Sequence, residues 1–257
     1  MISGLIDTHA HLDQIEELDA VLQRAHEAGL EAIIAVGTDY ESSKKIIEIS
    51  QKQNPVAVFS ALGVHPSEID KPLREDILTL IEENRDKIVA VGEIGLDYWF
   101  KPVKKDKSKR EIQKEIFQKQ LNIAKALNLP VVIHSRGAWE DCLLLCQESG
   151  IQKALFHWYS GPINILDKIL KANYFISATP SLYYSSQLQD AVKHVPLDHL
   201  LVETDCPVFY KNAEGGFSAE PKDVVSTIQL VSQMKQMKEN EIAQSTLENA
   251  KRFFNLS

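Results

Sequence analysis

Short apolar runs alternate along the chain with longer segments in which apolar residues recur every three or four positions. Short runs that are rich in β-branched side chains predict buried strands, whereas the wider spacing, as from Leu18 to Ala28, predicts amphipathic helices. Strands are expected over Leu5–His9, Ala32–Gly37, Val56–Gly63, Ile88–Ile94, Val131–His134, Ala154–Trp158, Tyr174–Ala178 and Leu200–Asp205.

Regular alternation of strands and helices predicts right-handed βαβ units around a parallel sheet. Eight such units within 257 residues predict an α/β fold, a (β/α)8 TIM barrel formed as a single domain over residues 1–257. Two helices between Lys222 and Phe254 are expected to close it. An open, doubly wound sheet is the alternative. No GxGxxG or GxxxxGK[ST] loop follows the first run, which disfavours that alternative and predicts that no nucleotide cofactor is bound.

The charge balance is acidic, with 28 Lys and Arg against 36 Asp and Glu and a formal net charge of −8. This balance excludes a molecule that is basic over its whole surface, as many nucleic-acid-binding domains are. One segment differs, because residues 101–110 carry six basic side chains and one acidic side chain. If this segment lies near the mouth of the barrel, its field could guide a polyanion there, although lysine runs are more often simply solvated.

The cysteine pattern and the lengths of the apolar runs indicate in which cellular compartment the protein is expected. Cys142, Cys146 and Cys206 are an odd number and form no CxxC pair, which favours a reducing environment. No basic and apolar leader opens the sequence, and no apolar run approaches the ~18 residues of a membrane span. We therefore expect a cytoplasmic protein without a membrane partner, and a monomer is compatible with these patterns.

Polar clusters follow five of the predicted strands, at Asp7–His11, Gly92–Asp97, His134–Arg136, His157–Gly161 and Glu203–Pro207. The carboxyl ends of the strands of a TIM barrel open on one mouth, so these clusters should meet there. Imidazole and carboxylate groups together are ligands for one or two divalent metal ions. No GxSxG pattern indicates a competing serine nucleophile. The expected metal ligands are His9, His11, Glu93, His134, His157 and Asp205.

The two-residue periodicity of strands refines this site, because residues i and i+2 share a face. His9 and His11 should both point into the barrel, with Asp7 one layer below them. By the same parity, Glu203 should lie beneath Asp205 and support it.

Further residues near the strand ends are candidates for binding a substrate. His65 ends the third strand, and Arg136 lies two residues beyond His134. The guanidinium fork of arginine matches phosphate oxygens, so we expect Arg136, together with His65, to hold a phosphate group. Four neighbouring aromatic residues could stack an unpaired base: Tyr98, Trp99, Trp158 and Tyr159.

Six motifs spread over nearly the whole chain resemble those of the TatD family of metal-dependent deoxyribonucleases. They are Ile6-Asp7-Thr8-His9-Ala10-His11, Gly63-Val64-His65-Pro66, Gly92-Glu93-Ile94-Gly95-Leu96-Asp97-Tyr98, His134-Ser135-Arg136, His157 with Ser160-Gly161, and Glu203-Thr204-Asp205-Cys206-Pro207. Two stretches depart from the family pattern, namely Trp158-Tyr159 and the loop from Phe209 to Ala219-Glu220-Pro221. Both are expected at the rim of the mouth, where they would affect the substrate rather than the metal.

The resemblance implies a barrel with one or two ions of Mg²⁺, Mn²⁺ or Zn²⁺ at the six ligand positions, with Glu93 bridging. It implies hydrolysis of phosphodiester bonds in DNA, from the 3′ end of a single strand. Asp205, Glu93 and Glu203 are then the expected catalytic residues, with Asp205 orienting or deprotonating the attacking water. Some relatives deacylate D-aminoacyl-tRNA, so a metal-dependent deacylase of that or a related ester is the alternative. A barrel that binds nucleic acid or protein without catalysis is disfavoured by the intact ligand set.

Overall fold

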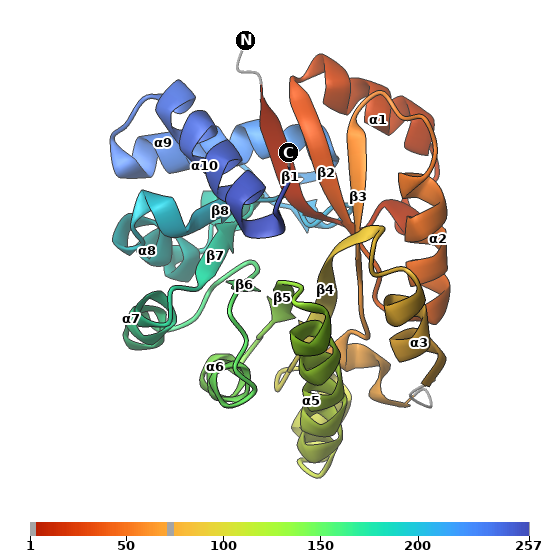
Figure 1. Cartoon of the computed structure of the whole chain (residues 1–257). Helices are drawn as coiled ribbons and strands as arrows, with labels where there is room; N and C mark the ends of the chain where they lie inside the picture. Colours follow the sequence, from red (N-terminus) through yellow and green to blue (C-terminus); the bar gives the residue numbers. More distant parts are fainter. Residues whose placement is uncertain (1–3, 71–74, 257) are drawn as a thin grey trace.

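The computed structural model describes residues 4–70 and 75–256. Eight strands form one parallel sheet whose spatial order follows the order of the chain, from β1 to β8 (Figure 1). Their bounds are β1 Leu5–Ala10, β2 Leu30–Val36, β3 Ala57–Leu62, β4 Ile88–Gly95, β5 Val131–His134, β6 Ala154–Phe156, β7 Phe175–Ala178 and β8 Leu200–Val202. Each predicted strand is therefore present, and the largest difference is at the carboxyl end of β8, where the strand stops at Val202, before the polar cluster.

The first and last strands meet at their carboxyl ends. Ala10 forms a parallel bridge with Cys206, and the amide of His11 donates to the carbonyl of Cys206 at 2.9 Å. The amide of Asp205 in turn donates to the carbonyl of His9 at 2.9 Å. The sequential strand order and this seam confirm the predicted (β/α)8 barrel and exclude the doubly wound alternative, whose strand order reverses at a switch point.

Helices surround the sheet and run back along it between consecutive strands (Figure 1). The helices are α1 Leu18–Glu27, α2 Tyr40–Ser50, α3 Glu75–Glu83, α4 Lys101–Lys105, α5 Lys109–Leu127, α6 Trp139–Glu148, α7 Ile163–Lys171, α8 Ser186–His194, α9 Val224–Lys235 and α10 Glu239–Phe254. The last two confirm the predicted pair between Lys222 and Phe254. A short hairpin of β9 (Phe209–Tyr210) and β10 (Phe217–Ser218) was not predicted, because two-residue strands have no detectable periodicity. None of the helices in the described ranges is long and apolar enough to cross a membrane.

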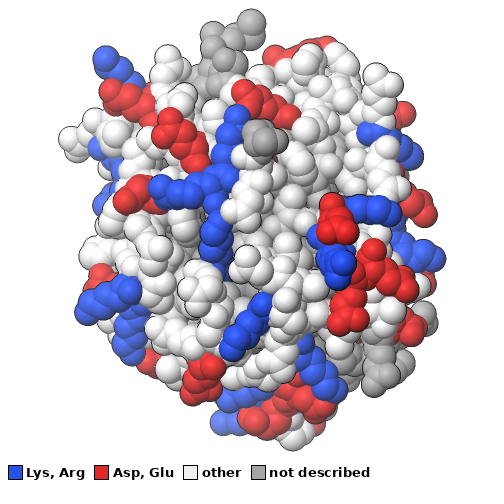
Figure 2. Space-filling view, viewed as in Figure 1, with Lys and Arg blue, Asp and Glu red and all other residues white. Residues whose placement is uncertain are grey.

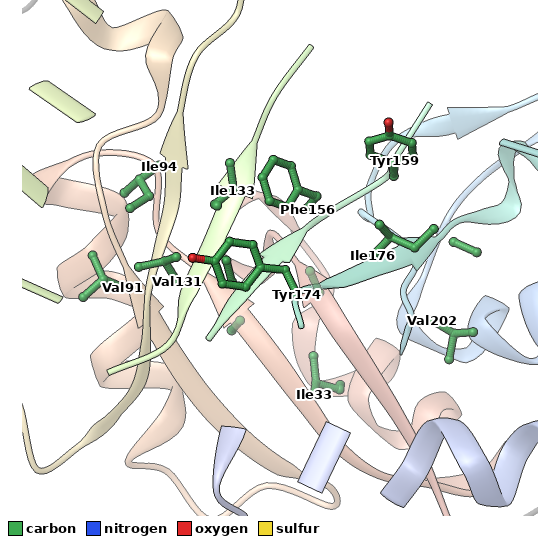
Figure 3. Packing of buried hydrophobic residues seen from close by; sticks show 14 of the residues in the cluster. Ile33, Val91, Ile94, Val131, Ile133, Phe156, Tyr159, Tyr174, Ile176 and Val202 are labelled. Atoms are coloured by element: carbon green, nitrogen blue, oxygen red, sulfur yellow. The ribbon is translucent and has the colours of Figure 1, made fainter. Parts of the chain in front are cut away.

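Two apolar layers hold the barrel together. The inner layer takes at least one side chain from every strand, such as Ile6, Ala90 and Leu201, and α10 covers one end of it with Phe253 and Phe254. The outer layer lies between the strands and the helices, and Figure 3 shows part of it. Burial of branched aliphatic side chains at about 25 cal/mol per Å² is the main stabilising contribution to such layers. None of the proposed metal ligands belongs to either apolar layer, so the packing of the barrel does not depend on them.

The strand register is irregular beside the predicted site. The pairing of β1 with β2 shifts between Asp7 and Ala10, and the pairing of β4 with β5 shifts between Val91 and Ile94. Such irregularities re-aim the side chains that follow them. The expectation that Asp7 lies one layer below His9 and His11 stays a prediction. Its carboxyl group accepts hydrogen bonds from the amide and hydroxyl of Thr204 on the β8 side of the seam. The two strand ends are thereby joined by a buried side chain.

Candidate metal centre and active site

A cavity of about 980 Å³ opens among the loops that follow the strands. This volume is at the upper end of the range found for small-molecule sites. The structure brings the predicted ligands together here, since His11, Glu93, His134, His157 and Asp205 all line the cavity. His9 lies among them and is fully buried. The predicted substrate-binding residues His65 and Arg136 also line the cavity.

Glu93 lies at the centre of the cluster and turns its two oxygens in different directions. Its Oε2 is 3.4 Å from Nε2 of His9 and 3.6 Å from Nε2 of His11. Its Oε1 is 2.7 Å from Nδ1 of His134 and 2.8 Å from Nε2 of His157. The carboxylate therefore separates two pairs of histidines and contacts both.

Asp205 completes the group on the Oε2 side. Its Oδ1 is 3.2 Å from Nε2 of His11 and 3.5 Å from Nε2 of His9. Its backbone has a φ of 49°, in the left-handed region that is uncommon outside glycine. Asp tolerates this conformation better than most residues, and here it turns the chain three residues after β8 and places the carboxylate in the cavity.

His157 stacks on His9, with the ring centroids 4.1 Å apart and the planes 7° from parallel. Its Nδ1 donates to Oε1 of Glu203 at 3.2 Å, and its Nε2 points at Oε1 of Glu93, 2.8 Å away. The second oxygen of Glu203 accepts from the hydroxyl of Ser177 at 2.6 Å. The prediction that Glu203 supports Asp205 is therefore wrong. Glu203 instead fixes the ring of His157, because a carboxylate behind a ligand histidine sets its tautomer and orientation.

Asp97 plays the same part for His134, and the sequence analysis gave it no role. Its Oδ2 accepts from Nε2 of His134 at 3.1 Å, which leaves Nδ1 of that ring to face Glu93. The same oxygen accepts from Nε and Nη2 of Arg136 at 3.0 and 2.7 Å. Asp97 follows Glu93 by four residues on the loop after β4, and it is almost completely buried. Its position after a ligand strand was the only available signal, because its partners depend on how that loop turns.

His65 reaches the cluster with its Nε2, which is 3.4 Å from Oε1 of Glu93. Its Nδ1 accepts a hydrogen bond from the amide of Ser67 at 3.0 Å. A neutral ring whose Nδ1 is an acceptor must carry its proton on Nε2. His65 therefore presents a donor to the cavity, which suits contact with an anionic oxygen better than coordination of a cation.

The electrostatics of the cluster follow from the burial of opposite charges. Burial alone would raise the pKa of Glu93, but His65, His157 and His134 around it hold that pKa well below its usual range. Burial would lower the pKa of His11, but the carboxylates of Asp205 and Glu93 raise it to about 9. Positive charge is thus strongly favoured between these two carboxylates.

Several polar atoms of the cluster have no hydrogen-bond partner within the part of the chain that the structure describes. They are Nδ1 and Nε2 of His9, Nδ1 of His11 and Oδ1 of Asp205, and all are buried. Buried polar atoms are seldom left without a partner. Three groups of ligand atoms lie within 4.8 Å of one another: His9, His157 and Asp205; His9, His11 and Glu93; and His65, Glu93 and His134. The donor set and its unpartnered atoms therefore fit a divalent metal centre with nitrogen and oxygen ligands.

The aromatic residues that were expected to stack a base differ in their accessibility. Tyr159 is fully buried, and its hydroxyl donates to the carbonyl of Pro162, so its predicted role is wrong. Tyr98 is covered by the guanidinium of Arg110, 4.2 Å from the ring centroid. Trp158 and Trp99 both line the cavity, and Trp99 is the more exposed.

The basic segment, residues 101–110, forms α4 and the start of α5, and the chain enters it from Trp99 and Phe100 at the cavity. Its lysines are not among the described residues that line the cavity. Figure 2 shows basic and acidic side chains interspersed over one face of the molecule, as the net charge leads one to expect. The role of the segment as a guide for a polyanion remains a prediction.

Comparison with known proteins agrees with this geometry. Residues 6–255 match the model of the family described as TatD related DNase. The chain belongs to this family. Deoxyribonuclease TATDN3 of Homo sapiens is 34% identical over 263 residues, covering 98% of this chain and 94% of that protein. The uncharacterized metal-dependent hydrolase YabD of Bacillus subtilis is 33% identical over 261 residues, covering 98% of this chain and 100% of that protein.

The fold comparison gives the same result. The crystal structure of the TatD homologue YJJV from Escherichia coli superposes with a TM-score of 0.89 over 100% of both chains, at 28% identity. The resemblance inferred from the motifs is thereby confirmed, and so is the assignment of the chain as a metal-dependent hydrolase that acts on ester bonds. Membership of a DNase family makes nucleic acid the implied class of substrate.

Proposed function

We propose that this TatD-family hydrolase cleaves phosphodiester bonds of single-stranded DNA, from the 3′ end, with one or two divalent cations at the Glu93 cluster. The observation that carries the proposal is the placement of Glu93, whose two oxygens each face a separate pair of histidines. His9, His11 and Asp205 would hold a cation on the Oε2 side, and His134 and His157 would hold one on the Oε1 side. Glu93 would be shared by both.

A bound divalent cation polarises phosphoryl oxygens and lowers the pKa of water toward 7. The protein supplies the remaining parts of the reaction. Asp205 orients the attacking water and accepts its proton, since its carboxylate lies at the cavity wall with one oxygen that has no hydrogen-bond partner among the described residues. Arg136 and His65 donate to the non-bridging oxygens of the phosphate, because both present N–H groups to the cavity.

The positions of the histidine rings are set by carboxylates behind them. Glu203 holds His157 and Asp97 holds His134, each through the ring nitrogen that faces away from Glu93. Such contacts typically change metal affinity or activity by about 10- to 100-fold. Glu203 therefore belongs to the catalytic machinery as a positioning residue.

The test is cleavage of a 5′-labelled single-stranded DNA oligonucleotide by the purified protein with Mn²⁺, Mg²⁺ or Zn²⁺, before and after EDTA. We expect a ladder of products shortened from the 3′ end, its loss with EDTA, and its return with added metal. Asp205→Asn should lower kcat by at least about 100-fold with metal present. Wild-type turnover by that variant would exclude the role of Asp205. Metal-dependent release of the amino acid from D-aminoacyl-tRNA, without cleavage of DNA, would favour the deacylase instead.

A further inference from the structure

An exposed tryptophan stands at the rim of the cavity, on the loop that carries Asp97. The side chain of Trp99 is 56% exposed and lines the same cavity as His134 and Arg136. Aromatic residues of this size are usually buried for most of their surface. An exposed indole beside Arg136, the candidate phosphate-binding residue, therefore suggests that Trp99 contacts the substrate.

The backbone of Trp99 is fixed to the active site. Oδ1 of Asp97 accepts hydrogen bonds from the amides of Trp99 and Phe100 at 2.9 and 2.8 Å. Oδ2 of the same carboxylate binds His134 and Arg136. One buried side chain thus ties a candidate metal ligand, a candidate phosphate-binding residue and the exposed indole together, and so fixes their spacing.

The indole itself is also held in place. Trp139 meets it edge to face, with the ring centroids 5.5 Å apart and an interplanar angle of 89°. On another side the ring lies directly on the backbone of Gly137, where an added Cβ would come within 2.6 Å of Cδ1 and Nε1 of Trp99. Gly137 also has a φ of +71°, which side chains rarely permit. The chain therefore has glycine where any side chain would displace the indole.

We propose that Trp99 is a stacking platform for an unpaired base of the DNA strand whose phosphate lies at the Glu93 cluster, and that Gly137 makes room for it. The inference rests on the proposed function and specifies its substrate. The faces of bases are available for stacking in a single strand but not in a duplex, and stacking is tolerant of sequence. Trp99 thereby favours single strands and contributes to binding the nucleotide next to the cleaved bond.

The experiment compares kcat/KM for three single-stranded oligonucleotides that differ at one position. One has all its bases, one has an abasic site at the 3′-terminal nucleotide, and one has it at the penultimate nucleotide. Loss of one stacked base typically weakens binding by about 5- to 100-fold. We expect the wild-type protein to lose that factor on one of the abasic strands. Trp99→Leu should lose it on the complete strand and show no further loss on the abasic strand.

Two further variants separate stacking from general damage. Gly137→Ala should also lose the preference for the complete strand, since its Cβ displaces the indole. The strain of alanine at a φ of +71° is measured separately, as a lower melting temperature. Leu144→Ala is the control, because Leu144 is 48% exposed on α6 and lies outside the described cavity lining, and it should leave all three values unchanged.

The outcomes distinguish this inference from the proposed function. If the wild-type protein cleaves none of the strands with any metal, the proposed function fails. If it cleaves all three equally, or if Trp99→Leu keeps the wild-type preference for the complete strand, the stacking role of Trp99 is wrong while the nuclease activity stands. Melting temperatures of the variants are measured alongside, and a well-folded Trp99→Leu protein is expected because the side chain is exposed.

Discussion

Oε1 of Glu203 accepts a hydrogen bond from Nδ1 of His157, and Oε2 accepts one from Ser177, so both oxygens of this fully buried carboxylate are used. His157 follows β6 and Glu203 follows β8, on either side of β7, which carries Ser177. The effect of Glu203 is to hold the ring of His157 with Nδ1 as a donor to Glu203 and Nε2 directed at Glu93. Glu203, 46 positions away in the sequence, thus fixes the orientation of the His157 ring.

Glu203→Gln should therefore weaken metal binding by about 10- to 100-fold, because it removes the negative charge behind His157 but keeps the shape of the side chain. The measurement is a titration of the metal-free protein with Zn²⁺ or Mn²⁺. Ser177→Ala leaves the carboxylate charged and should have a smaller effect. An unchanged metal affinity in Glu203→Gln would show that this contact does not orient His157 for metal binding.

Arg136→Ala should lower kcat/KM for phosphodiesters by about 10- to 100-fold, as expected for the loss of charged hydrogen bonds to phosphate. Arg136→Lys keeps the charge but not the fork, so it should recover only part of the activity. Steady-state kinetics on a DNA oligonucleotide provide the measurement. If both variants match the wild-type protein in KM and kcat, Arg136 does not contact the phosphate.

The basic segment, residues 101–110, predicts a particular dependence on salt. Replacing Lys104, Lys105 and Lys107 by Ser should flatten the plot of log affinity against log salt for single-stranded DNA by up to about 2, at roughly 0.7 per phosphate contact. Binding is measured by fluorescence anisotropy with Asp205→Asn, so that the strand is not degraded.

A matched variant replaces Lys125, Lys171 and Lys193, which lie in the last turns of α5, α7 and α8. These helices run back from the mouth, so their ends lie at the other end of the barrel. This variant should retain the wild-type slope. Equal slopes of log affinity against log salt for the two triple variants would show that the basic segment does not guide the DNA strand.

Asp141 predicts a pH dependence of stability that is independent of the metal. Burial raises its pKa, but hydrogen bonds from Tyr98 and from Lys114 at 3.0 Å outweigh this and hold the pKa below its usual value. A carboxyl group whose pKa is lower in the folded state stabilises the fold above its unfolded pKa of about 3.9, and the contribution is lost as the pH falls through the lowered value.

Asp141→Asn should accordingly lower the melting temperature by about 1–3 °C at pH 7, and the difference from wild type should shrink as the pH falls below about 4. Asp86→Asn is the control, because the side chain of Asp86 is 92% exposed and should leave the melting temperature unchanged. A deficit of the same size at pH 7 and at pH 3 would mean that Asp141 acts by packing rather than by charge.

The convergence of the six ligands could be predicted from the sequence because it depends only on topology. Each proposed ligand lies near or just after the carboxyl end of a strand, and the strands of a TIM barrel share one open end. The partners behind the ligands could not be predicted, because they depend on local irregularities of the backbone. The register shift after Val91, the left-handed turn at Asp205 and the loop that folds Asp97 back onto His134 have no signal in hydrophobic periodicity.

The seam between β1 and β8 determines at what stage of folding the candidate metal site can form. His9 lies in the first strand and His11 directly follows it, whereas Asp205 follows the last strand. Backbone hydrogen bonds join these segments only when the barrel is closed. A nascent or truncated chain that lacks β8 and Asp205 would supply only part of the proposed ligand set. Binding of a cation by these histidines and Asp205 would therefore require the assembled barrel, and it would stabilise the seam between β1 and β8.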